Sequence, residues 1–454
     1  MYELKKSQLY RLPWSLNDNP IGWLETTDVC NLNCKGCYRQ KLGGHKTLEE
    51  IKEEILLLKE LRNIDNVSIA GGEPLTHPDI DEIIAFIDRQ GIKPYMLTNG
   101  KAVTRPRIAE LRKRGLAGIA FHVDMMQKRE GWEDKDEIGL IPLREEYLEA
   151  VKGMGVPVSF GITVYKDNYE QVPELVRWGI KNIKWVQGQT FITYRAALIA
   201  PGIRYHVNGV EVPVDMSSLG YATQEAPDQF DITSNDVAAL INKHFPEYGA
   251  MSYLGGSTRQ DSFKWVIAFM IGSDDGWYGH AGPKTMELMQ TVHHLFTGTY
   301  FAYTRSTKCS RGAFLASLFD PHMRAGTARF LRNPFNFVFK PLYGQSIGII
   351  QAPDVLADGR ADMCDSCPDI TVYKGKFVHS CRMDEYRKYG GLMQRIPEGG
   401  DHISIEPDFP AHQAAAVSPK TKRAAKTTGD DDGNGKKPGR TTQGAGRKPR
   451  TSKV

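Results

Sequence analysis

The most informative segment of this 454-residue chain is Cys30-Asn31-Leu32-Asn33-Cys34-Lys35-Gly36-Cys37-Tyr38. Its three thiols are spaced C-x3-C-x2-C, so they converge only if the backbone curls into a loop around a common centre. Thiolates at this spacing suit a soft metal ion or an iron–sulfur cluster. Three cysteines leave one iron of a four-iron cluster open, whereas a structural metal site is normally closed by a fourth ligand. The loop therefore predicts either a reactive cluster or a structural zinc site.

Glycine-containing segments end two predicted strands after this loop. They are Val67-Ser68-Ile69-Ala70-Gly71-Gly72-Glu73-Pro74 and Lys93-Pro94-Tyr95-Met96-Leu97-Thr98-Asn99-Gly100. Glycines let the backbone approach a ligand closely, and Glu73 can accept hydrogen bonds from an ammonium group. An apolar run before the loop, Ile21–Thr27, is predicted to be the first strand.

In this order, the segments resemble the radical S-adenosylmethionine (SAM) superfamily, and the resemblance favours an iron–sulfur cluster over zinc. It implies that a [4Fe–4S] cluster is held by Cys30, Cys34 and Cys37. The cofactor contacts it implies are Gly71, Gly72, Glu73, Pro74, Asn99, His122 and Asp124. Many members carry an aromatic residue before the third cysteine, packed on the adenine. This chain has Gly36 at that position, so Tyr38 or a later side chain would have to contact the adenine instead.

The resemblance also implies an activity. One electron from the cluster would cleave SAM to methionine and a 5′-deoxyadenosyl radical, which would abstract hydrogen from an unidentified substrate. The cofactor would supply the difficult chemistry and the protein would direct it. A flavodoxin- or ferredoxin-like reductant is the expected electron donor.

Residues 20–195 alternate predicted strands and helices, which indicates a parallel α/β sheet with right-handed crossovers. Thr47 and Glu50 form a capping-box pattern before a helix whose apolar face is predicted to contain Ile51, Ile55, Leu58 and Leu61. Later helices are predicted at Asp79–Gln90, Pro106–Arg114, Leu143–Gly153 and Tyr169–Gly179. Later strands are predicted at Ala117–Val123, Pro157–Val164 and Lys184–Gln187. In this superfamily such a pattern makes a partial (β/α)6 barrel, with ligands at the carboxyl ends of the strands.

Polar residues at later strand ends are weaker site candidates. His122 and Asp124 share one side of a strand, where they either contact SAM or substrate or merely end the strand with a salt bridge or a cap. Thr163, Gln187 and Gln189 are candidates of the same kind.

The middle of the chain, 196–360, is predicted to be a mainly helical insertion that forms the substrate region. Helical runs such as Thr285–Phe301 precede an aromatic section, Phe314–Tyr343, with interleaved basic residues. That section predicts either a lipid or membrane surface or, by the favoured reading, aromatics that fill the insertion's own core. The pair His293-His294 is taken as structural because adjacent helical residues point in different directions.

A second thiol triplet, Cys364, Cys367 and Cys381, has the spacing C-x2-C-x13-C. Lys374-Gly375 between two short apolar runs signals a hairpin that brings Cys381 back beside the first pair. The spacing resembles twitch-type auxiliary-cluster subdomains, such as that of GTP 3′,8-cyclases, and implies a second [4Fe–4S] cluster. The alternative is a zinc ribbon with Cys309 or His379 as fourth ligand. Cys309 is otherwise a further cluster ligand, a hydrogen-atom donor or a buried side chain.

The composition of the chain indicates the cellular compartment in which the protein is located. Six of the seven cysteines fall into the two triplets, which favours metal ligation in a reducing compartment over disulfides. The start of the chain lacks a secretory signal, and no segment approaches the ~20 apolar residues that span a bilayer. We therefore expect a cytoplasmic protein. The expected divisions are an extension at 1–19, the radical SAM core at 20–195, the insertion at 196–360, an auxiliary-cluster subdomain at 361–405 and a disordered basic tail at 411–454.

Two other radical SAM activities and one non-enzymatic role compete with the general prediction. A peptide-modifying maturase would fit the second cluster motif, and a lipid- or envelope-modifying enzyme would fit the aromatic and basic middle section. A zinc-binding scaffold would fit both triplets without catalysis.

The formal charge of +4 arises in the tail, because the chain before Lys420 carries a net charge of −4. We expect no nucleic-acid binding by the body and a solvated tail. Truncation after Pro410 is therefore expected to leave DNA and RNA binding at background in a gel-shift assay. A salt-sensitive shift that the truncation abolishes would contradict this expectation.

Overall fold

The computed structural model describes residues 2–41, 43–198, 202–220, 222–225, 227–229, 231–259, 261–303, 311–356 and 360–397. Contacts within the chain divide it into Met1–Pro410 and Ala411–Val454. The predictions made for Cys309 and for the tail at 411–454 lie outside the described residues.

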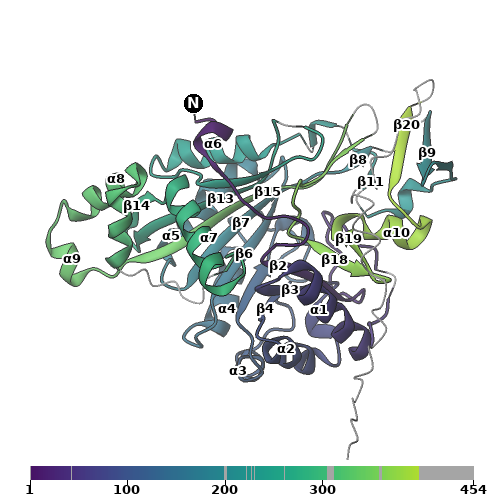
Figure 1. Ribbon diagram of the computed structural model, residues 1–454, viewed down its shortest axis with the longest axis horizontal. Helices are drawn as coiled ribbons and strands as arrows, with labels where there is room; N and C mark the ends of the chain where they lie inside the picture. Colours follow the sequence, from purple (N-terminus) through teal and green to yellow (C-terminus); the bar gives the residue numbers. More distant parts are fainter. Residues whose placement is uncertain are drawn as a thin grey trace, which may run out of the picture. The chain divides into compact units, whose positions relative to one another are not determined.

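Six parallel strands lie side by side in chain order at the centre of the fold (Figure 1). They are β2 (Ile21–Thr27), β3 (Asn66–Gly71), β4 (Lys93–Thr98), β5 (Gly118–His122), β6 (Val158–Val164) and β7 (Val186–Thr193). The helices that connect them are α1 (Leu48–Arg62), α2 (Ile80–Arg89), α3 (Arg105–Lys113), α4 (Ile141–Val151) and α5 (Val172–Lys181). The predicted α/β alternation with a parallel sheet is confirmed.

Helix α1 begins as predicted. The Thr47 hydroxyl accepts a hydrogen bond from the Glu50 amide at 3.3 Å, and the Glu50 carboxylate accepts one from the Thr47 amide at 2.8 Å. The predicted apolar face is buried at Ile51, Ile55 and Leu58. Leu61 is only half-buried, and the last residue of the helix, Arg62, is buried instead.

The sixth strand was predicted too early in the chain. Its predicted start, Lys184, lies in a turn in which the amides of Trp185 and Val186 donate to the Asn182 carbonyl at 2.8 and 2.9 Å. These bonds keep the backbone in a turn, so the strand starts only at Val186 and continues to Thr193.

The middle of the chain is not mainly helical, and this prediction is wrong. The strands of 196–360 that join the main sheet are β12 (Ser252–Gly255), β13 (Phe263–Ser273), β14 (Gly276–His280) and β15 (Tyr343–Gln351). Strand β15 pairs in parallel with β7, with Ser346 opposite Gly188, and antiparallel with β13. Strand β1 (Tyr10–Arg11) joins at β12. Apolar runs such as Phe263–Ser273 do not distinguish strand from helix by periodicity, and the open edge of β7 decides the outcome.

Helices and small sheets complete the middle region. The helices are α6 (Ser234–His244), α7 (Pro283–Thr297), α8 (Pro321–Leu331) and α9 (Phe335–Phe339). The short strands are β8 (Ala197–Leu198), β9 (Ile203–Val207), β10 (Val210–Glu211), β11 (Ala222–Thr223), β16 (Asp354–Val355) and β17 (Ala361–Asp362). Short 3-10 helices occur at Lys6–Gln8, Pro74–Thr76, Met125–Gln127, Tyr169–Gln171, Met216–Ser218, Pro227–Gln229, Arg311–Leu318 and Ser380–Arg382. No helix among the described residues combines the length and apolar character needed to cross a bilayer.

The predicted hairpin near the second thiol triplet is confirmed. Strands β18 (Ile370–Tyr373) and β19 (Lys376–His379) pair antiparallel across Lys374 and Gly375, whose φ angles are 49° and 73°. Positive φ at both central residues is the geometry of a tight hairpin turn. Helix α10 (Met383–Tyr389) follows, and strand β20 (Met393–Pro397) pairs with β9.

A single hydrophobic core spans the predicted radical SAM core and the predicted insertion. Its members include Leu24, Ile69, Met96, Phe121, Phe160, Val266, Ile347 and Ile349. The two regions therefore fold around shared apolar contacts.

The buried guanidinium of Arg62, at the end of α1, joins three parts of the chain. It donates to the carbonyls of Ile21 at 2.9 Å and Leu16 at 2.8 Å, and to the carbonyl of Cys367 in the second thiol triplet. Burial lowers the pKa of Arg62 to about 10, so the group stays charged at neutral pH.

Replacing Arg62 is expected to destabilise the fold strongly. The change Arg62→Met leaves several buried carbonyls without a donor, which costs about 3–5 kcal/mol of unfolding free energy. Arg89→Met is the matched control because Arg89 is exposed and pairs with the exposed carboxylate of Glu82, so its loss should change the unfolding free energy little. Urea unfolding monitored by tryptophan fluorescence measures both, and equal losses would contradict the role of Arg62.

Candidate active site

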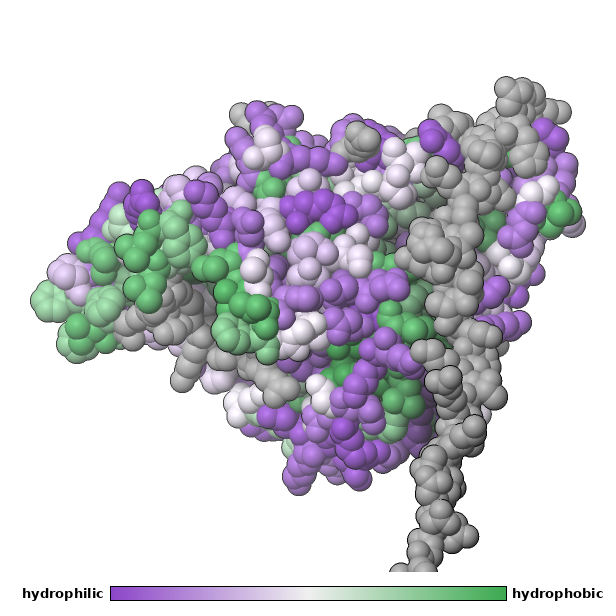
Figure 2. All heavy atoms as spheres, viewed as in Figure 1, coloured by the Kyte–Doolittle hydropathy of each residue, from purple (hydrophilic) through white to green (hydrophobic). Residues whose placement is uncertain are grey.

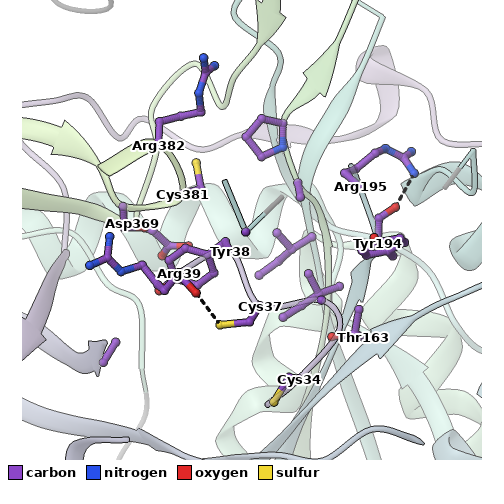
Figure 3. A pocket seen from close by; sticks show the side chains of 18 of the residues that line it. Cys34, Cys37, Tyr38, Arg39, Thr163, Tyr194, Arg195, Asp369, Cys381 and Arg382 are labelled. Atoms are coloured by element: carbon purple, nitrogen blue, oxygen red, sulfur yellow. Dashed lines mark hydrogen bonds between the residues drawn. The ribbon is translucent and has the colours of Figure 1, made fainter. Parts of the chain in front are cut away.

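A cavity of about 340 Å³ opens at the carboxyl ends of the parallel strands, and both cysteine triplets line it. Every strand from β2 to β7 contributes residues at or just after its end, and so does β15. Figure 3 shows Cys34 and Cys37 from the first triplet in the same view as Cys381 from the second. The tertiary fold thus brings two segments to one cavity although more than 300 residues separate Cys37 from Cys364 along the chain.

The first cysteine loop is held by backbone contacts. The Cys37 amide donates to the Cys34 carbonyl at 3.3 Å, and the Lys35 amide donates to the Met126 carbonyl at 3.3 Å. Burial, followed by the carboxylate of Asp124 and the neighbouring thiols, raises the pKa of Cys34 to about 12. Burial also raises the pKa of Cys37. Without a metal these thiols are protonated, so binding of a cluster must release protons.

Gly71 and Gly72 lie where backbone passes the cysteine loop closely. Gly71 has a φ of 114°, and a Cβ atom at Gly72 would lie 2.2 Å from the Val29 carbonyl oxygen. Both glycines line the cavity. Only glycine fits these two positions, so the sequence pattern has a local steric cause.

Glu73 is buried beneath the cavity wall. Its carboxylate accepts hydrogen bonds from the Thr98 hydroxyl at 2.7 Å, the Asn99 amide at 2.7 Å and the Leu75 amide at 3.1 Å. Burial raises the pKa of Glu73. Neither Glu73 nor the buried Pro74 is among the residues that line the cavity. In this structure Glu73 fixes the ends of β3 and β4 against each other, and its predicted contact with an ammonium stays a prediction.

Asn99 contacts the cysteine loop directly. Its amide nitrogen donates to the Asn31 side-chain oxygen at 2.6 Å and lies 3.9 Å from the Cys30 sulfur. Its side-chain oxygen accepts from the Lys101 amide at 2.9 Å. Asn99 therefore orients the loop at the edge of the cavity.

His122 and Asp124 make the predicted contacts of a strand end, and their predicted contact with SAM or substrate stays a prediction. The His122 Nε2 lies 2.9 Å from the Asp124 carboxylate and 3.1 Å from the Thr163 hydroxyl, and Asp124 accepts from the Met126 amide at 2.9 Å as a cap. His122, Asp124 and Thr163 also line the cavity. They are ordered by one another and still face the space where a ligand would bind.

The remaining predicted polar candidates do not line the cavity. Gln187 and Gln189 are buried, and Gln189 donates to the Leu175 carbonyl at 2.7 Å. His293 lies 2.8 Å from the Thr299 carbonyl, and His294 lies 3.0 Å from the Asp18 carboxylate. The two histidines thus make separate structural contacts, as predicted.

Aromatic side chains surround the position of Gly36. A Cβ atom at Gly36 would lie 2.6 Å from the Tyr165 hydroxyl oxygen, and the Tyr165 ring packs against Tyr194 with centroids 5.1 Å apart. Tyr194 and Tyr38 line the cavity, and Tyr38 donates to the Glu25 carboxylate at 3.3 Å. Tyr165 therefore occupies the space that a side chain at position 36 would need.

Arg39 is a site residue that the sequence analysis missed. Its buried guanidinium lies 2.9 Å from the carboxylates of both Asp28 and Asp384, and 3.5 Å from that of Glu25. These carboxylates raise the pKa of Arg39 against the effect of burial. Arg39 ties the first cysteine loop to α10, and no local sequence pattern announces a partner 345 residues away.

The second triplet has one buried member and two half-buried members. Cys367 is buried, and its pKa is raised by the hydrogen bond with Cys364 and by burial. Burial also raises the pKa of Cys381. Asp369 lines the same cavity, and burial raises its pKa to about 7.

The zinc alternative named His379 as a possible fourth ligand. Burial lowers the pKa of His379 to about 3, and His379 is not among the cavity-lining residues. Within the described ranges no group of three or more His, Cys, Asp or Glu side chains is arranged around a single metal ion. A cubane binds each thiolate through a different iron, so three thiols in one cavity are the kind of donor set that it requires.

Comparison with known proteins gives a family for the first part of the chain. Residues 24–179 match the Radical SAM superfamily. An AdoMet-dependent heme synthase of Methanosarcina barkeri is 27% identical over 34% of this chain and 44% of its own length. A PqqA peptide cyclase of Xanthomonas campestris pv. campestris is 23% identical over 43% of this chain and 55% of its own length. The chain thus spans about half the length of the curated relatives it matches.

Part of the chain is also similar to solved structures. Streptococcus suis SuiB bound to S-adenosylmethionine covers 40% of this chain and 42% of its own, at 20% identity and a TM-score of 0.32. The same protein bound to its precursor peptide SuiA aligns with a TM-score of 0.33. The family match, however, rests on the sequence, and residues 24–179 of this chain form a radical SAM domain.

Proposed function

We propose that this protein is a radical SAM enzyme that cleaves SAM reductively and abstracts a hydrogen atom from its substrate. The observation that carries the proposal is the cavity of a radical SAM domain lined by two cysteine triplets. When bound, a [4Fe–4S] cluster at the first triplet supplies the electron for SAM cleavage. A flavodoxin- or ferredoxin-like protein is the proposed reductant, and the reduced thiols favour a cytoplasmic location.

The side chains around the first triplet have distinct tasks. Cys30, Cys34 and Cys37 would hold the cluster, while Asn99 and the glycines at 71 and 72 shape the adjoining ligand space. Glu73 holds Asn99 through its amide and so keeps the loop contact in place. Tyr38 and Tyr194 offer aromatic faces for an adenine.

A second cluster at Cys364, Cys367 and Cys381 would anchor substrate or accept an electron after the reaction. Its support is the shared cavity together with two buried contacts: Arg62 holds Cys367 against the start of β2, and Arg39 holds α10 against the first loop. Apolar side chains line the space and would exclude water, among them Trp265 and Ile350 from the middle region, Ile192 from β7 and Met363 next to Cys364.

A peptide substrate is the second candidate, and the names of two relatives favour it. One relative is named a PqqA peptide cyclase, and SuiB is named as bound to the precursor peptide SuiA. Incubation with a precursor peptide encoded beside the gene, followed by mass spectrometry, tests this candidate. A loss of two hydrogens from the peptide would support it.

Removing one thiol of the first triplet is expected to abolish SAM cleavage. Cys34→Ala leaves the cluster with two ligands, so 5′-deoxyadenosine should fall to background on reduction with dithionite, measured by liquid chromatography. Cys367→Ala should lower the iron content from about eight to about four per chain while cleavage persists. Two zinc ions per chain and no cleavage in the unaltered protein would support the scaffold alternative.

Filling the space at Gly36 is expected to displace Tyr165. Gly36→Ala should lower cluster retention about ten-fold because overpacking costs about 1–3 kcal/mol. The double change Gly36→Ala with Tyr165→Phe removes the hydroxyl that the new methyl group meets and should restore most of the iron. Iron content and 5′-deoxyadenosine yield are measured for both single variants and the double variant. A double variant no better than Gly36→Ala would refute the packing argument.

A further inference from the structure

Large apolar side chains are exposed on the segment that includes α8 and α9. Phe335, Phe339 and Leu318 are 68%, 78% and 77% exposed. The rings of Phe335 and Phe339, one helical turn apart, stack with centroids 6.5 Å apart. We call the surface formed by Leu315, Leu318, Leu331, Phe335 and Phe339 the apolar tip. Figure 2 shows this hydrophobic surface at the left end of the view, over α8 and α9.

The local core does not account for these side chains. Phe330 is fully buried and packs against Tyr278 and Phe314, so the expectation that aromatics fill the insertion's own core holds for this residue. Phe335 and Phe339 follow it within nine residues and remain exposed. The sequence therefore supplies more apolar surface here than the core uses, and such patches commonly mark binding sites.

The apolar tip is held firmly in its orientation. Helix α8 packs against β14 at Gly279, where an added Cβ would lie 2.7 Å from the Gly326 Cα. The Arg329 guanidinium donates to the Tyr278 carbonyl at 2.7 Å, and the Asn336 amide donates to the Phe330 carbonyl at 2.9 Å. These contacts hold α9 in an outward orientation. The exposure of Phe335 is therefore a property of a firmly held helix and not of a loosely attached loop.

The charged side chains of this segment are all basic, and two of them face carboxylates of other elements: Lys340 pairs with Asp275, and Arg329 lies 4.0 Å from Glu247. Between Pro321 and Lys340 there are four Arg or Lys residues and no Asp or Glu. Arg324 donates to the carbonyls of Ser317 and Leu318, and Arg332 is exposed beside Leu331. Apolar rings with a cationic rim match an anionic, apolar partner.

We propose that the apolar tip binds the surface of a bilayer that contains anionic phospholipid. Phe335 and Phe339 would enter the boundary between headgroups and acyl chains, while Arg324 and Arg332 would lie at the phosphates. A second copy of the chain fits less well, because a two-fold contact would place the basic rims against each other.

Vesicle co-sedimentation of the anaerobically purified full-length protein tests the proposal. Binding is expected with vesicles of phosphatidylcholine and phosphatidylglycerol mixed at about 7:3 and to be weaker with pure phosphatidylcholine. The double change Phe335→Ser with Phe339→Ser should weaken binding about ten-fold or more. The control is Val210→Ser, which alters an equally exposed apolar residue on β10 (65% exposed) outside the tip and should bind as the unaltered protein does.

Two further measurements test the role of the basic residues and the depth of insertion separately. Arg324→Glu with Arg332→Glu should remove the preference for anionic vesicles. The fluorescence of the tryptophan introduced by Phe335→Trp should be quenched by brominated lipid. The fluorescence of the tryptophan introduced by Val210→Trp should not be quenched. Equal vesicle binding by the unaltered protein and the Phe335/Phe339 variant would overturn the proposal. Concentration-dependent dimerisation in sedimentation velocity, lost in that variant without a change in vesicle binding, would assign the tip to a second copy instead.

Discussion

The guanidinium of Arg62 is the contact on which the geometry of the cavity depends. It ends the first helix of the radical SAM domain, and its donors reach the carbonyls of Ile21, Leu16 and Cys367. Arginine suits this task because its planar fork carries five donors and stays charged even when burial lowers its pKa. The bonds hold the second thiol segment against the first strand, so the two triplets share one space. Arg39 makes the corresponding connection to α10 through Asp384.

The sheet supports this arrangement by placing unrelated segments at one edge. Parallel strands present their carboxyl ends together, which is why residues following β2, β3, β4 and β5 all line the cavity. Strand β15 extends the same edge beyond β7 and contributes Ile350 to the wall. The middle of the chain is consequently part of the site as well as a support for it. Its side chains in the cavity wall are largely apolar, and such a lining limits the access of water.

The middle region has a buried inner surface and a solvent-exposed outer surface. Its inner strands bury apolar side chains against the shared core, whereas α9 projects phenylalanines into solvent. Burial of Phe330 beside exposure of Phe335 shows that composition alone does not decide which aromatic rings become core. The contacts of Gly279 with Gly326 and of Asn336 with Phe330 set that division.

The sequence alone was sufficient for the parallel order of six strands, the capping box at Thr47, the hairpin at Lys374-Gly375 and the candidate thiol ligands. Each of these depends on local periodicity, on turn chemistry or on short spacing. The tertiary structure alone decided that β12, β13 and β15 extend the sheet, that Glu73 lies beneath the cavity wall, and that Arg39 and Arg62 join the two thiol segments. Those outcomes arise from pairing and hydrogen bonding between residues far apart in the chain, and such contacts leave no periodic trace in the sequence.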